Sequence, residues 1–266
     1  MYSEPKLSSP ANIFWIALAT IGVLAWCFGS QTWDWYQAKK MGESQPCLRL
    51  GVRPMVMGDA DVIPVTKEAF FGYEFEVPWP NAEAAITRKM VTLTAPSGHG
   101  LILWDPTAIP QVFEDASKPI QHPNMKDAIG SVVGKEAALS NYDFVKHILD
   151  MTPERISPFL SKREANGRLT LLRMKSGLYC EKGHPVFYSY QQSGLNCLQL
   201  GEFGVGRVIE VKCFDRMDRE LNFHFSTQPD AVTALTQAEI NRVIQTLRPE
   251  EKPSALPSEA STRNTN

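Results

Sequence analysis

The sequence predicts an α+β protein in which an N-terminal transmembrane helix carries one domain with a mainly antiparallel sheet. Three observations lead to this prediction. The chain begins with a long apolar segment, its second half holds several short segments of alternating apolar and polar residues, and it closes with an amphipathic helix. A helical insertion separates the early strands from the later ones. The predicted divisions are an anchor at 1–36, a linker at 37–46, a domain at 47–249 and a disordered tail at 250–266.

The anchor is the apolar segment Ala11–Gly29, and no charged residue occurs between Lys6 and Asp34. About 20 residues at about 1.5 Å each span the roughly 30 Å hydrocarbon core of a bilayer as a helix. Amphipathic aromatic residues favour the headgroup level, and three of them follow the segment directly: Trp33, Trp35 and Tyr36. We therefore expect this segment to bind the lipid bilayer as a single-pass helix.

A cleaved signal peptide is the main alternative to an uncleaved anchor. It would need a basic first region, but Lys6 is offset by Glu4. The bulky Trp26 also stands before Cys27, where a lipoprotein signal requires a small residue. These departures favour an uncleaved anchor.

The side of the membrane on which the domain lies is predicted from two opposing arguments. Lysine and arginine residues are more frequent after the anchor than before it, which favours a cytoplasmic domain. An N-terminal segment of about a dozen residues, however, usually stays inside. We predict an extracytoplasmic domain.

The charge balance argues against a nucleic-acid partner. The 266 residues include 27 basic and 29 acidic ones, whereas nucleic-acid binding requires a basic field. The domain contains four cysteines, an even number that permits two disulfides without requiring them: Cys47, Cys180, Cys197 and Cys213.

The first half of the domain predicts strands and then helices. Residues 48–52 alternate as a short strand would, Tyr73–Val77 is a clear half-buried strand, and 91–95 and 101–104 form a hairpin. Weaker helices are expected at 107–116 and 126–139. Ser140 is a good N-cap for the next helix, and a broken helix is expected to follow to about Ala165, where Asn166-Gly167 ends it.

The second half predicts an antiparallel meander, with strands at 169–174, 186–191, 197–200, 208–214 and 221–225. A turn at Gly204-Val205 sets Leu200 against Ile209 and Leu198 against Val211. Cys197 and Cys213 then face opposite sides of the sheet. A slip of one residue would expose two leucines at about 1.5 to 3 kcal/mol each, whereas a disulfide across about 15 residues returns about 3 kcal/mol. We therefore predict no Cys197–Cys213 bond.

The last element is a helix with a capping box, Thr236-x-x-Glu239, and Pro249 closes it. The segments FGYEFEVPWP, VFYSYQQ, VIEVKCF, LNFHF and EINRVIQTL together resemble the PsbP/Mog1-like fold, as found in membrane-anchored bacterial proteins. The resemblance covers roughly residues 65–248 and rests on the order of elements. It implies a binding or assembly factor and assigns no functional residue.

The search for catalytic motifs identifies only partial matches. Residues 130–136 resemble a P-loop but are one residue short, and Glu136 stands where magnesium binding needs Ser or Thr. Ser97 and His99 share a turn, but a hydrolase would need them in contact with each other and with a carboxylate. Cys180 and His184 offer two zinc ligands, whereas a site needs three or four.

The remaining histidines, His147 and His224, are interpreted as surface residues. Six aromatic residues either fill the core or line a groove for a small ligand or a protein partner: Trp79, Trp104, Phe113, Phe187, Tyr188 and Tyr190. We predict no catalytic, cofactor-binding or metal-binding residue. The predicted function is a non-enzymatic, membrane-anchored binding or accessory domain, and the alternative is a membrane-tethered hydrolase that uses His99 or His184.

Overall fold

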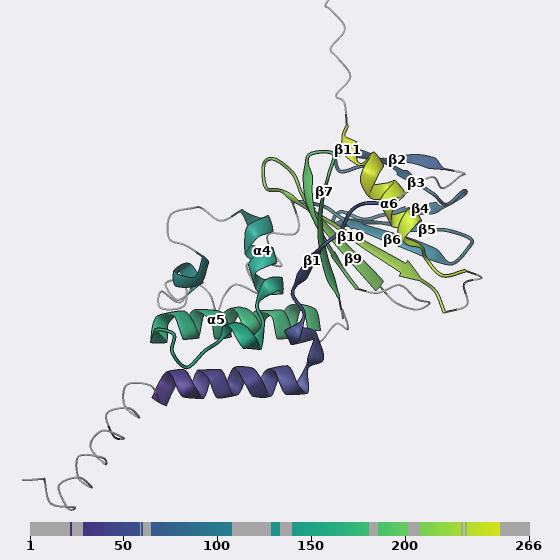
Figure 1. Cartoon of the computed structure of the whole chain (residues 1–266). Coiled ribbons are helices and arrows are strands. Elements are labelled where there is room, and N and C mark those ends of the chain that lie inside the picture. The colour runs from purple at the N-terminus through teal and green to yellow at the C-terminus, as the bar shows by residue number, and fades with distance from the viewer. Residues whose placement is uncertain are drawn as a thin grey trace, which may run out of the picture.

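A sheet of eight strands organises the protein, with helices on both of its faces (Figure 1). This computed structural model describes residues 22, 29–58, 60, 65–107, 129–133, 140–180, 186–201, 208–229, 231 and 233–250. The strands, in their order across the sheet, are β1 (Val52–Pro54), β7 (Phe187–Gln192), β8 (Leu195–Leu200), β9 (Val208–Phe214), β10 (Glu220–Thr227), β6 (His99–Trp104), β5 (Met90–Thr94) and β4 (Glu83–Ile86). Only β1 and β7 pair in parallel among them, so the predicted α+β class with a mainly antiparallel sheet is confirmed.

A smaller sheet of three strands lies beside the large one, in the order β11 (Arg248–Pro249), β3 (Tyr73–Val77) and β2 (Thr66–Phe70). Helix α6 (Gln237–Thr246) packs against β3 and covers one face of the large sheet (Figure 1). The first hydrophobic core lies between them and is rich in aromatic side chains, including Phe75, Phe223 and Phe225.

The other face of the sheet is covered by a helical layer. It consists of α4 (Asn141–Asp150), α5 (Lys162–Lys175) and a helix at residues 29–44. Two short 3₁₀ helices, Pro46–Arg49 and Pro153–Arg155, and a π-helical turn, Ser176–Cys180, connect these helices to the sheet. Side chains from the helices and from β7, β8 and β9 form the second hydrophobic core.

The local signals for two helix starts and for several strands are confirmed. The Ser140 side chain accepts a hydrogen bond from the Asp143 N–H at the start of α4. Both hydrogen bonds of the Thr236–Glu239 capping box are present at the start of α6. Strands β3 and β9 have the predicted bounds, and β5 and β6 form the predicted hairpin.

The prediction for residues 166–174 is wrong, because α5 (Lys162–Lys175) continues through Asn166-Gly167 and replaces the strand expected at 169–174. Ser161 caps this helix by accepting a hydrogen bond from the Glu164 N–H. Buried Ala165, Leu169 and Leu172 then recur at the spacing of one helix face. Gly within a helix costs about 1 kcal/mol, which the burial of this face outweighs.

The predicted register of β8 and β9 is wrong by one residue. Cys197 pairs with Cys213, Gln199 with Val211 and Leu200 with Glu210. The prediction assumed that only one face of the sheet is buried, but the helical layer covers the other face, and Leu198 and Leu200 are buried there. The slip therefore costs no leucine burial, and the disulfide that the prediction excluded is present.

The segment expected as a linker is also structured. Residues 37–44 belong to the helix at 29–44, Ala38 is fully buried in the second core, and Gln37 accepts a hydrogen bond from Arg173. No helix within the described residues is long and apolar enough to cross a membrane. Of Ala11–Gly29, only residues 22 and 29 are described.

Several other predictions lie outside the described residues. These include the turn at Gly204-Val205, most of the two weaker helices and nearly all of the C-terminal tail. Within the second of those helices, residues 129–133 are described and are helical.

Candidate functional site

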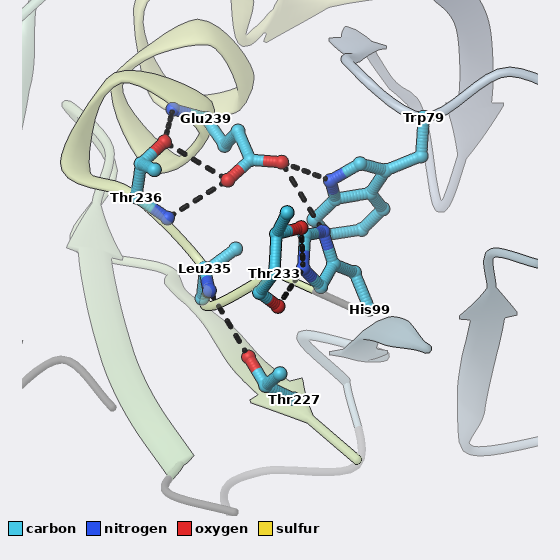
Figure 2. Close-up of polar contacts among 7 residues, drawn as sticks. All are labelled: Trp79, His99, Thr227, Thr233, Leu235, Thr236 and Glu239. Atoms are coloured by element: carbon cyan, nitrogen blue, oxygen red, sulfur yellow. Dashed lines mark hydrogen bonds and ion pairs between the residues drawn. The ribbon is translucent and has the colours of Figure 1, made fainter. Parts of the chain in front are cut away.

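The most concentrated group of chemically versatile side chains surrounds His99, the first residue of β6. Its neighbours are Glu239 in the first turn of α6, Thr233 in the connection between β10 and α6, and Trp79 in the segment after β3 (Figure 2). His99 is only 3% exposed, and the Trp79 ring packs edge-on against the imidazole with a centroid distance of 5.7 Å. We call these four residues the His99 cluster.

The Glu239 carboxylate is the centre of the cluster. Its Oε1 atom accepts a hydrogen bond of 2.8 Å from Trp79 Nε1 and lies 3.2 Å from His99 Nδ1. Its Oε2 atom accepts hydrogen bonds from the backbone N–H and the hydroxyl of Thr236, at 2.8 and 2.9 Å. One carboxylate therefore caps α6 and also holds the imidazole and the indole of the first core.

The second nitrogen of His99 also faces oxygen. His99 Nε2 lies 3.0 Å from the Thr233 carbonyl oxygen and 3.5 Å from the Thr233 hydroxyl oxygen. Both ring nitrogens therefore lie close to oxygen atoms, although the contact of Nδ1 with Glu239 does not meet hydrogen-bond geometry. The cluster thus brings a carboxylate and an imidazole together in a buried position.

The same residues contain the parts of a hydrolytic triad, namely a hydroxyl, an imidazole and a carboxylate. The contacts differ from those of a working triad, because the closest partner of Nε2 is a carbonyl oxygen and the carboxylate is shared with a helix cap. Ser97, the hydroxyl that the sequence suggested, is exposed and is not part of the cluster. The geometry suits a structural tie between β6, α6 and the segment after β3.

The other metal and catalytic candidates weighed from the sequence form no site within the described part of the chain. His184 lies outside the described residues, and Cys180 is bonded to Cys47, so that its sulfur is not a zinc ligand. The described residues contain no group of three or more His, Cys, Asp or Glu side chains that could hold a metal ion. His147 is half-buried on α4, and His224 Nε2 lies 3.8 Å from Glu210 Oε1.

A buried charged group on β9 and β10 was not anticipated from the sequence. Lys212 Nζ lies 2.8 Å from Glu210 Oε1 and 2.7 Å from Glu220 Oε1 on the face that the helical layer covers. Burial alone would raise the pKa of Glu210, but the Lys212 ammonium lowers it to about 2. Attraction to the two carboxylates likewise outweighs burial and raises the pKa of Lys212. The sequence offered one signal for this buried group, namely that Glu210 and Lys212 stand at alternate positions within the otherwise apolar strand VIEVKCF.

Lys175 is a second buried cation, at the end of α5. Its ammonium donates hydrogen bonds to three backbone carbonyl groups, those of Leu48, Leu50 and Met151, and lies over the Phe187 ring. Burial lowers the pKa of Lys175 to about 8. This side chain ties the segment after the first helix to α5.

An open groove of about 590 Å³ lies between the smaller sheet and the end of α6. Its walls are formed by residues 67–69, 74–76 and 245–249 and by Ser193, so it does not include the His99 cluster. The structure places three of the six aromatic residues singled out from the sequence in the two hydrophobic cores. Trp79 and Tyr190 belong to the first core, Phe187 belongs to the second, and Phe113 lies outside the described residues.

Comparisons of the chain with protein-family models, curated proteins and solved structures found no significant match. The function must therefore be argued from the residues described above.

Proposed function

We propose that this chain is a membrane-anchored, non-enzymatic binding or accessory protein whose folded domain lies outside the cytoplasm. The observation that carries the proposal is the pair of disulfides, Cys47–Cys180 and Cys197–Cys213. Structural disulfides persist in oxidising compartments and are rare in the cytosol. Together with the apolar segment Ala11–Gly29, they favour an extracytoplasmic domain over the orientation that the lysine and arginine count suggests.

The position of the Cys47–Cys180 bond supports an anchoring role. Cys47 follows the helix at 29–44 directly, and Cys180 ends the turn that follows α5. The bond therefore fastens the chain that leaves the proposed anchor to the helical layer of the domain. Lys175 reinforces the same junction through its three carbonyl contacts.

The non-enzymatic part of the proposal rests on how the His99 cluster is used. Glu239 is engaged by Trp79, His99 and Thr236, and the imidazole is 3% exposed. A catalytic imidazole must reach a substrate, whereas this one is enclosed by the groups that it ties together.

Orientation and oxidation can be tested in one preparation. The full chain is expressed in a bacterium, spheroplasts are treated with protease, and free thiols are blocked at lysis before non-reducing peptide mapping. We expect digestion of the domain in intact spheroplasts and recovery of both disulfide-linked peptide pairs. A domain that is protected until lysis and yields reduced cysteines would overturn the proposed location.

The binding role needs a separate measurement on the same spheroplasts. A membrane-impermeant cross-linker should convert the full chain into discrete, reproducible adducts that identify a partner. Recovery of the uncross-linked chain alone, under conditions that cross-link a known periplasmic complex, would contradict a binding function.

One observation favours the hydrolase as a second candidate. The Thr233 hydroxyl oxygen lies 3.5 Å from His99 Nε2, and Thr233 is exposed although His99 is not. A phosphonate probe that modifies activated hydroxyl groups distinguishes the two candidates. A stoichiometric adduct that disappears in Thr233→Ala would establish the hydrolase, and the absence of an adduct supports the structural interpretation of the cluster.

A further inference from the structure

The helix at 29–44 and α5 lie side by side and run in the same direction (Figure 1). Near their C-terminal ends, Ser176 Oγ donates a hydrogen bond of 2.6 Å to Gln45 Oε1. Further toward the N-terminal ends, Arg173 donates one of 2.6 Å to Gln37. Because the contacts progress in the same order along both helices, the N-terminal end of α5 lies beside the N-terminal end of the first helix.

This arrangement sets the level of the α5 N-terminus relative to the proposed membrane. Lys162 precedes Ser176 by as many residues as Gln31 precedes Gln45 (176 − 162 = 45 − 31). With equal rise per residue, this contact sets the two at about the same level, and the Arg173–Gln37 contact agrees with it to within about 8 Å, a distance that an arginine side chain can span. The start of α5 is therefore level with the point where the apolar segment ends.

Exposed aromatic side chains occur near the N-terminal ends of both helices. Phe159, three residues before α5, is 86% exposed, and Trp33 is 58% exposed. The turn that carries Phe159 is fixed, because Ser157 accepts hydrogen bonds from the backbone N–H groups of Phe159 and Leu160. An exposed Phe held on an ordered turn would gain free energy if its ring moved from water into an apolar environment.

Basic side chains accompany these rings. Lys162 and Arg163 are exposed in the first turn of α5, where the helix dipole disfavours cations. Asp34 lies near Lys162 and Arg173, and burial raises the pKa of its carboxyl group. Cations beside exposed aromatic rings suit the headgroup region of a bilayer, in which phosphates lie next to acyl chains.

We propose that Phe159, flanked by Trp33, Lys162 and Arg163, is a second membrane contact of this protein. The Phe159 ring inserts into the interfacial region of the same leaflet from which the chain emerges, and the two basic side chains pair with lipid phosphates. The proposal rests on the proposed anchor. Two contacts would fix the orientation of the domain, with the β4 edge of the large sheet directed away from the bilayer (Figure 1).

The test uses the full chain with Cys27→Ser, reconstituted in vesicles of phosphatidylcholine with a minority of phosphatidylglycerol. An environment-sensitive dye is attached to Phe159→Cys or, as the matched control, to Ile86→Cys. Ile86 is 67% exposed on β4, at the opposite end of the molecule (Figure 1). We expect lipid-borne nitroxide to quench the dye at 159 severalfold more than at 86, and aqueous iodide to do the reverse.

The outcomes separate this inference from the proposal on which it rests. If the chain floats with vesicles but iodide quenches both dyes equally, the Phe159 contact is wrong and the anchor stands. If the chain does not float at all, the anchor is wrong as well. Lys162→Glu with Arg163→Glu should raise iodide access at 159 and leave flotation unchanged, and unchanged iodide access would overturn the role of the cations.

Discussion

Cys197 on β8 lies directly opposite Cys213 on β9, and the two side chains form a disulfide within the first hydrophobic core. Both cysteines are fully buried, and each also fills the volume of a small apolar residue. The bond closes a loop with a sequence separation of 16 residues.

The first prediction is that Cys197→Ala with Cys213→Ala lowers the free energy of unfolding by about 3 kcal/mol, because a cross-link of this loop length restricts the unfolded chain. Urea denaturation of the detergent-solubilised chain measures the loss. Cys27→Ser, outside both disulfides, is the control and should change nothing. An unchanged midpoint for the double variant would mean that the bond does not form in the protein.

This pair also shows where sequence reasoning failed. The caps at Ser140 and Thr236 and the β5–β6 hairpin were predicted correctly because their signals lie within a few residues. The register of β8 and β9 depends on which face of the sheet is buried, and only the tertiary packing of α4 and α5 answers that. The predicted helix stopped at Asn166-Gly167 for a similar reason. The prediction followed the low helix propensity of these two residues, whereas the packing of the buried face of α5 determines the structure there.

The His99 cluster lay beyond sequence reasoning altogether. His99, Trp79 and Glu239 are far apart in the chain, and nothing local in the sequence indicates that the imidazole meets the helix cap. The capping box in the sequence accounts for Glu239 as a helix-capping residue, so it gives no sign that the same carboxylate also contacts Trp79 and His99. The buried charges at Glu210 and Lys212 were visible only as alternating charges in an apolar strand.

The second prediction concerns this cluster. Glu239→Gln replaces the carboxylate that accepts a hydrogen bond from Trp79 and faces His99, while it keeps an amide oxygen for the Thr236 cap, and we expect a loss of about 2 kcal/mol. Thr236→Ala, which breaks only the cap, should cost about 1 kcal/mol. Thermal and urea unfolding compare the two. Equal losses would show that the His99–Glu239 pair contributes little beyond the cap.

The third prediction is a loss of stability in acid. Attraction to Lys212 lowers the folded pKa of Glu210 to about 2 from an ordinary value of 4.5, despite burial. The stabilisation is therefore present above about pH 4.5 and is lost as the pH falls toward 2, by on the order of 2 kcal/mol. Glu210→Gln should flatten this acid limb, whereas Glu83→Gln on exposed β4 should retain it. An acid limb unchanged in Glu210→Gln would refute the assignment.

The fourth prediction is a gain of stability in mild alkali. Burial lowers the folded pKa of Lys175 to about 8, below its ordinary value of 10.5, so the unfolded chain binds more protons between these values. The free energy of unfolding should rise by about 2 kcal/mol from pH 8 to 10. Above about pH 10 it should fall again, because burial raises the pKa values of Tyr179 and Tyr190.

Lys175→Met tests the assignment, since it removes the titrating group and should abolish the rise between pH 8 and 10. Lys40→Met, at an exposed position of the first helix, is the matched control and should keep the rise. A rise that persists in Lys175→Met would assign the effect to another group.

The last prediction tests whether the first helix belongs to the folded domain. At Gly42 an added Cβ would lie 2.6 Å from Pro153 Cγ, whereas at Gly29 nothing lies within 4 Å. Alanine raises helix propensity by about 1 kcal/mol at either position. Gly29→Ala should therefore be neutral or stabilising, while Gly42→Ala should destabilise by about 1 to 2 kcal/mol because the overlap with Pro153 outweighs the propensity gain. If Gly42→Ala is as stable as Gly29→Ala in urea unfolding, the helix does not pack on the domain and a chain beginning at Met41 should fold without loss. The burial of Ala38 and the Arg173–Gln37 hydrogen bond argue instead that such a truncation removes part of the second core.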